Sequence, residues 1–326
     1  MRLARRSISY PIADRMPHRV LTGPRPPPRL AAVKPPPFRY ADPATIEEAL
    51  GLLARHGADA KILAGGQSLM PLMNMRLARP HVLIDINRIR ALSHISLDAN
   101  GALAIGALTR QRAIERASLV QTHYPLLSAV MPSLGHFQIR NRGTIGGSIV
   151  HADPAAELPA LCLALEAEFV LRSAVGQRTV NAADFFRTYL TTAIEPVEML
   201  VDIRFPPWQA QWRWGFQEIC RREGDFALVG AVAVLRMDDD AVCQAARLTM
   251  FGVGGTPVRP QRAEELLSGQ RLERRVLDQL ASVVAAELEP DSDIHASAEY
   301  RREVGGVVAR RAVEIALGNA RGHNER

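Results

Sequence analysis

Two short glycine-rich segments contain the residues of this chain whose types and spacing favour ligand binding. The first reads Leu63-Ala64-Gly65-Gly66-Gln67-Ser68-Leu69, and the second contains Thr144 followed by Gly146-Gly147-Ser148. A Gly-Gly pair reaches backbone angles that other residues avoid, and it lets main-chain N–H groups come close to a ligand. Successive N–H groups in such a turn form a concave site for anions. Two such turns with adjacent hydroxyls predict that they share the diphosphate of a dinucleotide cofactor.

The charge distribution argues against nucleic-acid binding. The chain has 326 residues, enough for two or three packed units, and a net charge of +6. Residues 1–37 alone hold eight Arg or Lys residues and a single acid, so the rest of the chain is slightly acidic. A body without excess positive charge lacks the main determinant of phosphate-backbone binding. The sequence also has no apolar run of about 18 residues, so we expect no membrane span.

The cysteines indicate that this chain holds no metal cluster of its own. Cys162, Cys220 and Cys243 lie far apart, and none belongs to a pattern of closely spaced Cys or His residues. Iron–sulfur and zinc sites use such patterns. The odd number of cysteines, without a secretion signal, favours the reducing cytoplasm.

The elements that position the first motif follow a proline-rich and arginine-rich segment. Residues 1–37 contain nine of the 22 prolines, which predicts a disordered tail; a transit peptide and a wrongly assigned start codon are the alternatives. Thr45 and Glu48 form a capping box that begins a helix ending near Gly57. A strand over 61–64 then leads into the first glycine turn, and a second strand covers 82–86. We expect one α/β unit over residues 38–91.

The second motif belongs to a larger α+β unit over residues 92–207. It begins with a hairpin over 95–105, whose Asn100-Gly101 turn is typical of such hairpins. Thr109 is expected to cap a helix over 110–117. Strands are expected over 168–171, 178–180 and 199–205, the last stopped by Pro206-Pro207. The pattern of residues 212–318 predicts three antiparallel strands followed by three helices. Residues 319–326 are expected to form a frayed end.

Several motifs in order resemble the FAD-binding medium subunit of molybdenum hydroxylases, the family of carbon monoxide dehydrogenase flavoproteins and the flavin domain of xanthine dehydrogenase. The resemblance covers about residues 35–320. It rests on both glycine motifs and on five further segments, which are 152–159 (ADPAAELP), 184–186 (DFF), 196–200 (PVEML), 222–229 (REGDFALV) and 297–302 (SAEYRR). Either glycine motif alone is weak evidence, whereas the ordered series is specific.

The resemblance implies a fold, a cofactor and partners. The fold is α+β, with the two-subdomain FAD-binding fold of the vanillyl-alcohol oxidase superfamily (PCMH-type), followed by a domain with a three-stranded sheet and a helix bundle. The cofactor is non-covalent FAD. The molybdenum cofactor is expected on a large partner subunit and two [2Fe–2S] clusters on a small one, assembled as a dimer of heterotrimers.

The resemblance also implies which residues bind the cofactor. The first glycine turn, Leu63 to Leu69, is expected to bind the FAD diphosphate, and Thr144, Gly146, Gly147, Ser148 and Val150 to contact the cofactor. The family acid toward the adenosine falls on Glu157, and an aliphatic contact falls on Leu200. A family lysine near the flavin falls on Gln217, which predicts an altered flavin potential or acceptor. No catalytic acid or base is expected, because the flavin carries the redox chemistry.

The function implied is that of an oxidoreductase subunit. Electrons from a substrate oxidised at molybdenum pass through the iron–sulfur clusters to FAD in this chain, and then to NAD, a quinone or another acceptor. Two alternatives stay open at this point. One is a self-contained FAD-dependent oxidase of the same superfamily, and the other is a non-enzymatic nucleotide-binding assembly protein.

Overall fold

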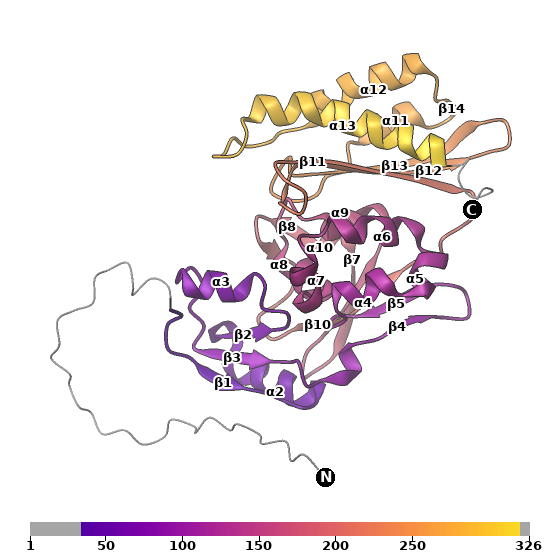
Figure 1. Cartoon of the computed structure of the whole chain (residues 1–326). Helices are drawn as coiled ribbons and strands as arrows, with labels where there is room; N and C mark the ends of the chain where they lie inside the picture. The colour runs from indigo at the N-terminus through magenta and orange to yellow at the C-terminus, as the bar shows by residue number, and fades with distance from the viewer. Residues whose placement is uncertain (1–33, 320–326) are drawn as a thin grey trace, which may run out of the picture.

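The computed structural model describes residues 34–319 as three stacked units (Figure 1). The expected disorder of residues 1–37 falls mostly outside this range, as does the frayed end expected over residues 319–326. In the described range no helix is both long enough and apolar enough to cross a membrane.

The first unit is a small parallel sheet with strand order β1-β3-β2. The helix α2 begins as expected, because the Thr45 hydroxyl accepts the Glu48 N–H at 3.1 Å while the Glu48 carboxylate accepts the Ala44 N–H at 2.7 Å. Its elements are β1 (Arg39–Ala41), α2 (Ile46–His56), β2 (Ala60–Leu63), α3 (Leu69–Asn74) and β3 (Val82–Asp85), with short 3-10 turns at Gly57–Asp59 and Arg90–Leu92.

The second unit is an antiparallel sheet with order β4-β5-β10-β6-β7, packed against short helices. The expected hairpin and Pro-Pro stop are both present. Its elements are β4 (Ile95–Leu97), β5 (Leu103–Gly106), α4 (Gln111–Arg116), α5 (Ser118–His123), α6 (Pro125–Val130), η3 (Met131–Ser133), α7 (Phe137–Arg142), α8 (Ile145–His151), α9 (Glu157–Ala164), β6 (Glu168–Arg172), β7 (Gln177–Asn181), α10 (Ala182–Phe185), β8 (Phe186–Thr188), β9 (Thr191–Thr192) and β10 (Met199–Phe205).

The third unit is a sheet with order β11-β12-β13-β14 that carries three helices on one face. Three long strands are present as expected, and a two-residue strand extends the edge. Its elements are β11 (Trp212–Cys220), β12 (Ala227–Met237), β13 (Val242–Phe251), α11 (Gln261–Leu267), β14 (Gln270–Arg271), α12 (Arg274–Glu287) and α13 (Ala298–Gly318).

The sheet of the third unit is covered on both faces, so it joins the helices above it to the second unit below it. Figure 1 shows α12 and α13 above the sheet and α9 and α6 beneath it. Alternate residues of β12 belong to different cores: Val229 and Ala231 pack with α13, whereas Val232 and Val234 pack with the second unit. Burial on both faces explains why β12 is an almost continuous apolar run.

One local prediction was wrong. Thr109 does not cap α4, which begins after Arg110 without a side-chain cap. The Thr109 hydroxyl is buried, where it accepts the His94 N–H at 3.1 Å and donates to the His94 carbonyl at 3.0 Å. A buried hydroxyl that already has two backbone partners is not available to a helix end.

Candidate functional site

The first glycine turn connects β2 to α3 and presents a row of free donors. Gly66 has φ +74°, in the left-handed region that favours glycine. Within the described part of the chain, no acceptor bonds the backbone N–H groups of Gly65, Gly66, Gln67 and Ser68. Unpaired main-chain donors cost free energy unless water or a ligand accepts from them. Four consecutive free donors make this turn an anion-binding concavity.

The second glycine pair is helical, and its donors are already in use. Thr144 is the N-cap of α8, and its hydroxyl accepts the Gly147 N–H at 3.0 Å. The Gly146 N–H donates to the Ala107 carbonyl at 2.9 Å. Neither glycine has a positive φ. The expectation of a second turn with free N–H groups was therefore wrong, because the Thr144 cap takes the Gly147 donor and the segment after β5 takes the Gly146 donor.

Gly146 is needed instead for close approach. A Cβ atom at Gly146 would lie 2.6 Å from the Ala107 carbonyl oxygen. A Cβ atom at Gly65, in the first motif, would lie 2.4 Å from the Arg142 carbonyl oxygen and 2.9 Å from the Gly143 Cα. The first glycine motif therefore lies directly against the backbone that leads into the second.

A polar network that sequence reasoning missed fixes the two motifs against each other. The Asn87 amide donates to the Ala64 carbonyl at 2.9 Å, and its oxygen accepts from Arg110 Nη2 at 2.6 Å. Arg110 Nη1 donates to the Arg142 carbonyl. Burial, followed by the neighbouring Arg142 charge, lowers the pKa of Arg110. The sequence feature that could have indicated this network is Asp85-Ile86-Asn87, two polar residues at the end of β3. The Asp85 carboxylate also accepts a hydrogen bond from the Asn87 amide.

The other residues of the second motif differ in how much surface they offer a ligand. Gly147 and Val150 are exposed, Ser148 is half-buried and Thr144 is buried. Leu200 is 4% exposed and belongs to the core of the second unit, so it offers little surface. The chain thus presents Gly147, Ser148 and Val150 on the outer side of α8.

Glu157 is an unusual residue because its carboxyl is buried without a cation. It begins α9 and is 5% exposed. Burial, with additional repulsion from Glu218 and Asp153, raises the pKa of Glu157 to about 8. The carboxyl is therefore mostly protonated at pH 7, a state in which it donates as well as accepts hydrogen bonds.

Gln217 lies on the side of β11 that faces the helical layer. The strand pairs regularly from Trp212 to Ile219, so its side chains alternate between two faces. A Cβ atom at Gly215 would meet the backbone of α13, and Ile219 packs in the α13 core. Gln217 shares their face, and its amide donates to the Glu218 carbonyl at 2.9 Å. Glu218 lies on the opposite face, the side from which Trp214 and Phe216 pack on the second unit.

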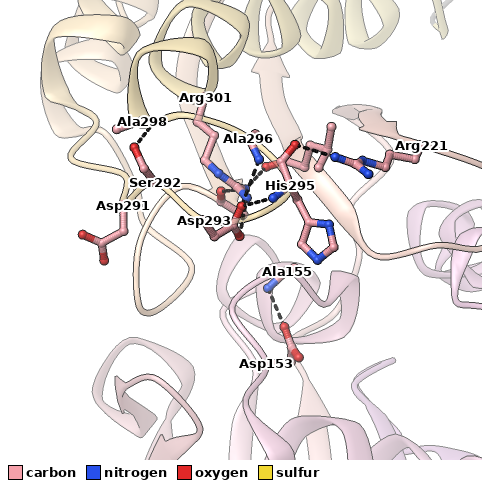
Figure 2. A network of polar contacts seen from close by, with 12 residues as sticks. Asp153, Ala155, Arg221, Asp291, Ser292, Asp293, His295, Ala296, Ala298 and Arg301 are labelled. Carbon is pink, nitrogen blue, oxygen red and sulfur yellow. Dashed lines mark hydrogen bonds and ion pairs between the residues drawn. The ribbon is translucent and has the colours of Figure 1, made fainter.

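A cavity of about 890 Å³ opens between the second and third units. In Figure 2, Asp153 and Ala155 lie on one side of it, opposite the segment from Asp291 to Ala296. The cavity wall also includes His136, just before α7, so residues flanking the second glycine motif on both sides contribute to it.

Arg301 holds the far side of this cavity in place (Figure 2). Its Nη2 donates to the Asp293 carboxylate at 2.7 Å, and its Nη1 donates to the Gly252 carbonyl at 2.8 Å. Asp293 accepts the His295 N–H at 2.8 Å. A buried guanidinium with several partners orders the loop before α13 and so fixes the shape of the cavity.

Comparisons with known proteins agree with this arrangement. Residues 36–208 match the FAD binding domain in molybdopterin dehydrogenase, and residues 214–316 match the CO dehydrogenase flavoprotein C-terminal domain. The chain is 39% identical to the 6-hydroxypseudooxynicotine dehydrogenase complex subunit alpha of Paenarthrobacter nicotinovorans, covering 89% of this chain and 97% of that protein. It is 30% identical to the xanthine dehydrogenase FAD-binding subunit of Escherichia coli, covering 87% and 97%. The carbon monoxide dehydrogenase structure from Hydrogenophaga pseudoflava superposes with a TM-score of 0.84 at 37% identity, covering 87% and 98%.

Proposed function

Because the chain belongs to the family of FAD-binding medium subunits of molybdenum hydroxylases, we propose that it binds FAD non-covalently across its two glycine motifs and relays electrons from a partner subunit to an acceptor. The observation that carries this proposal is the row of four free N–H groups at Gly65 to Ser68, held against the second motif by Asn87 and Arg110.

The residues of the site fit a dinucleotide. The free N–H groups of the first turn match the anionic oxygens of a diphosphate. The exposed side of α8 offers Gly147, the Ser148 hydroxyl and Val150 to the rest of the cofactor. The half-buried Arg110 adds positive charge behind the turn. When bound, FAD supplies the redox chemistry between single-electron clusters and the acceptor, while the protein binds and orients it.

The supporting roles of the remaining predicted residues differ. In this proposal Glu157, as a neutral carboxyl, forms a hydrogen bond with the cofactor. Thr144 positions α8. Leu200 supports the strand beneath them from within the core. Gln217 is left out of the proposed site because its side chain shares the α13 face of β11.

The partners and the acceptor follow from the family. Relatives include a carbon monoxide dehydrogenase medium chain and subunit beta of a caffeine dehydrogenase. We propose that this chain assembles with a large subunit that holds the molybdenum cofactor and a small subunit that holds [2Fe–2S] clusters. Two such heterotrimers form a dimer, and the complex is located in the reducing cytoplasm. The cavity between the second and third units is the proposed approach for NAD, a quinone or another acceptor, because residues that flank the second glycine motif on both sides border it.

A flavin titration tests the proposed cofactor. The purified full-length chain, stripped of flavin, is titrated with FAD and in parallel with FMN, and binding is followed by quenching of flavin fluorescence. We expect one FAD per chain and at least tenfold weaker FMN binding, since FMN lacks the diphosphate and a loss of about 1.4 kcal/mol already corresponds to that factor. Equal affinity for the two flavins would contradict the diphosphate assignment.

A further inference from the structure

The cavity between the second and third units has two exposed aromatic rings in its wall. Its volume of about 890 Å³ falls within the range of sites that bind small organic molecules. Phe226, in the loop between β11 and β12, is 60% exposed, and Tyr189, in the loop between β8 and β9, is 47% exposed. Both residues line the cavity. Aromatic side chains that stay open to solvent in a concave site favour a flat ring that packs against them.

The charged residues that line the cavity carry an excess of negative charge. With the histidines counted as neutral, acids outnumber bases in this lining, which contains Asp153, Asp225, Asp291, Asp293, Arg221 and Arg301. Arg301 is only 7% exposed, and its guanidinium donates to the Asp293 carboxylate at 2.7 Å. The charges of this pair therefore compensate each other within the protein.

The other three acids of the lining have no cation of their own. Asp291 accepts from the Tyr189 hydroxyl at 2.6 Å, and Asp153 accepts a backbone N–H at 2.9 Å. Both partners are neutral groups, which do not cancel a negative charge. The third acid, Asp225, is exposed. Against these three carboxylates, Arg221 is the remaining arginine of the described lining. A ligand in the cavity therefore meets a wall with net negative charge.

On the premise that FAD binds as proposed above, we propose that this cavity takes an uncharged quinone as the electron acceptor and disfavours NAD. A quinone presents a flat ring to Phe226 and Tyr189 and brings no charge to the acidic wall. It takes two electrons and two protons from reduced FAD, leaves as a quinol, and so regenerates oxidised FAD.

The first glycine turn shows what a diphosphate requires, and the lining of the cavity differs from it. In the turn, the consecutive N–H groups from Gly65 to Ser68 have no acceptor within the described chain, so they are free to donate to an anion. In the cavity, the diphosphate of NAD would meet the three carboxylates and a single arginine. Like charges repel at close range, which weakens the binding of any diphosphate there.

The test measures equilibrium binding to the FAD-loaded full-length chain in its oxidised state, in which no electrons are transferred. The ligands are an anthraquinone sulfonate, its uncharged hydroxymethyl analogue and NAD⁺, and equilibrium dialysis gives the Kd of each. We expect the uncharged quinone to bind at least about tenfold more tightly than either anionic ligand, because the wall repels negative charge. High salt should reduce this preference, since ions screen exposed charges.

The variant D225N separates charge from shape. Asparagine has nearly the shape of aspartate, and Asp225 is exposed, so the replacement removes one negative charge with little effect on folding. D225N should bind the sulfonate roughly threefold more tightly and leave the Kd of the uncharged analogue unchanged. D239N is the matched control, because Asp239 is equally an exposed acid but lies beyond the opposite end of β12, outside the lining of the cavity. It should change neither Kd.

The variant F226A shows whether the quinones bind in this cavity. Loss of the exposed ring should weaken the binding of both quinones by roughly tenfold. Unchanged Kd values in a folded F226A chain would place the quinones elsewhere and overturn the inference. Equal affinity of the FAD-loaded wild type for the charged and uncharged quinones, or tighter binding of NAD⁺ than of the uncharged quinone, would also overturn it. A chain that takes up no FAD would instead contradict the proposed function.

Discussion

At the scale of the residue, the first glycine turn depends on two glycines for different physical reasons. A side chain at Gly65 would collide with the Arg142 carbonyl, a backbone atom that cannot rotate away. A side chain at Gly66 would be strained by φ +74°, although its nearest neighbours are flexible side chains. Gly65 therefore sets the distance between the two motifs, and Gly66 sets the direction of the free N–H groups.

We predict that G65A and G66A both weaken FAD binding. G66A should do so by roughly tenfold, since forcing an L-residue into the left-handed region costs about 1–2 kcal/mol. G65A should have a larger effect, because the backbone of one motif must move. G176A is the matched control: Gly176 lies in the β6–β7 turn with nothing within 4 Å of its Cβ position and no positive φ. Titration calorimetry, with circular dichroism to verify folding, makes the measurement, and full FAD affinity in a folded G65A chain would refute the proposed site.

At the scale of the element, α8 and α3 both begin with a hydroxyl residue, but only one of these hydroxyls caps its helix. Thr144 accepts the Gly147 N–H, whereas Ser68 makes no capping hydrogen bond. T144A should therefore lower the free energy of unfolding by about 1 kcal/mol, or the thermal midpoint by about 2–4 °C.

S68A serves as the control for that measurement and should leave the midpoint nearly unchanged. Thermal unfolding of the two variants, followed by circular dichroism without cofactor, separates helix capping from ligand binding. Equal losses in both variants would mean that the stability effect comes from the hydroxyl residues generally and not from the cap of α8.

At the scale of the whole molecule, the chain has the two domains of an FAD-binding medium subunit. Within residues 34–319, no group of three or more His, Cys, Asp or Glu side chains is placed to hold a metal ion. Cys162 and Cys243 are buried, and burial raises the pKa of the Cys162 thiol. A thiol held protonated in an apolar core is a poor metal ligand.

We therefore predict that the FAD-loaded chain alone does not oxidise carbon monoxide, purines, aldehydes or N-heterocycles. The measurement is anaerobic bleaching of the flavin absorbance after each substrate is added, first to the chain alone and then to the chain with its large and small partners. Bleaching should require both partners. Rapid bleaching of the isolated chain by a small organic substrate would instead favour a self-contained oxidase.

Local chemistry made much of this protein predictable from its sequence. The Thr45–Glu48 box, the Asn100-Gly101 hairpin and the Pro206-Pro207 stop act over a few residues, and each is present in the structure as expected. The glycine motifs and the ordered series of segments around them identified the family, because motifs in series are far more specific than any one of them. The first turn has the free N–H groups that its glycines predict, although Asn87 and Arg142, which are distant in the sequence, hold it in place.

The tertiary structure decided whatever depends on partners distant in the sequence. It gave the Gly146 N–H to the Ala107 carbonyl, and it left the N–H groups of Gly65 to Ser68 free. It turned Gln217 toward the helices, because the pairing of β11 fixes which alternate side chains face each layer. It also buried the carboxyl of Glu157, an ordinary acid in the sequence, and this burial raises the pKa of Glu157 to about 8.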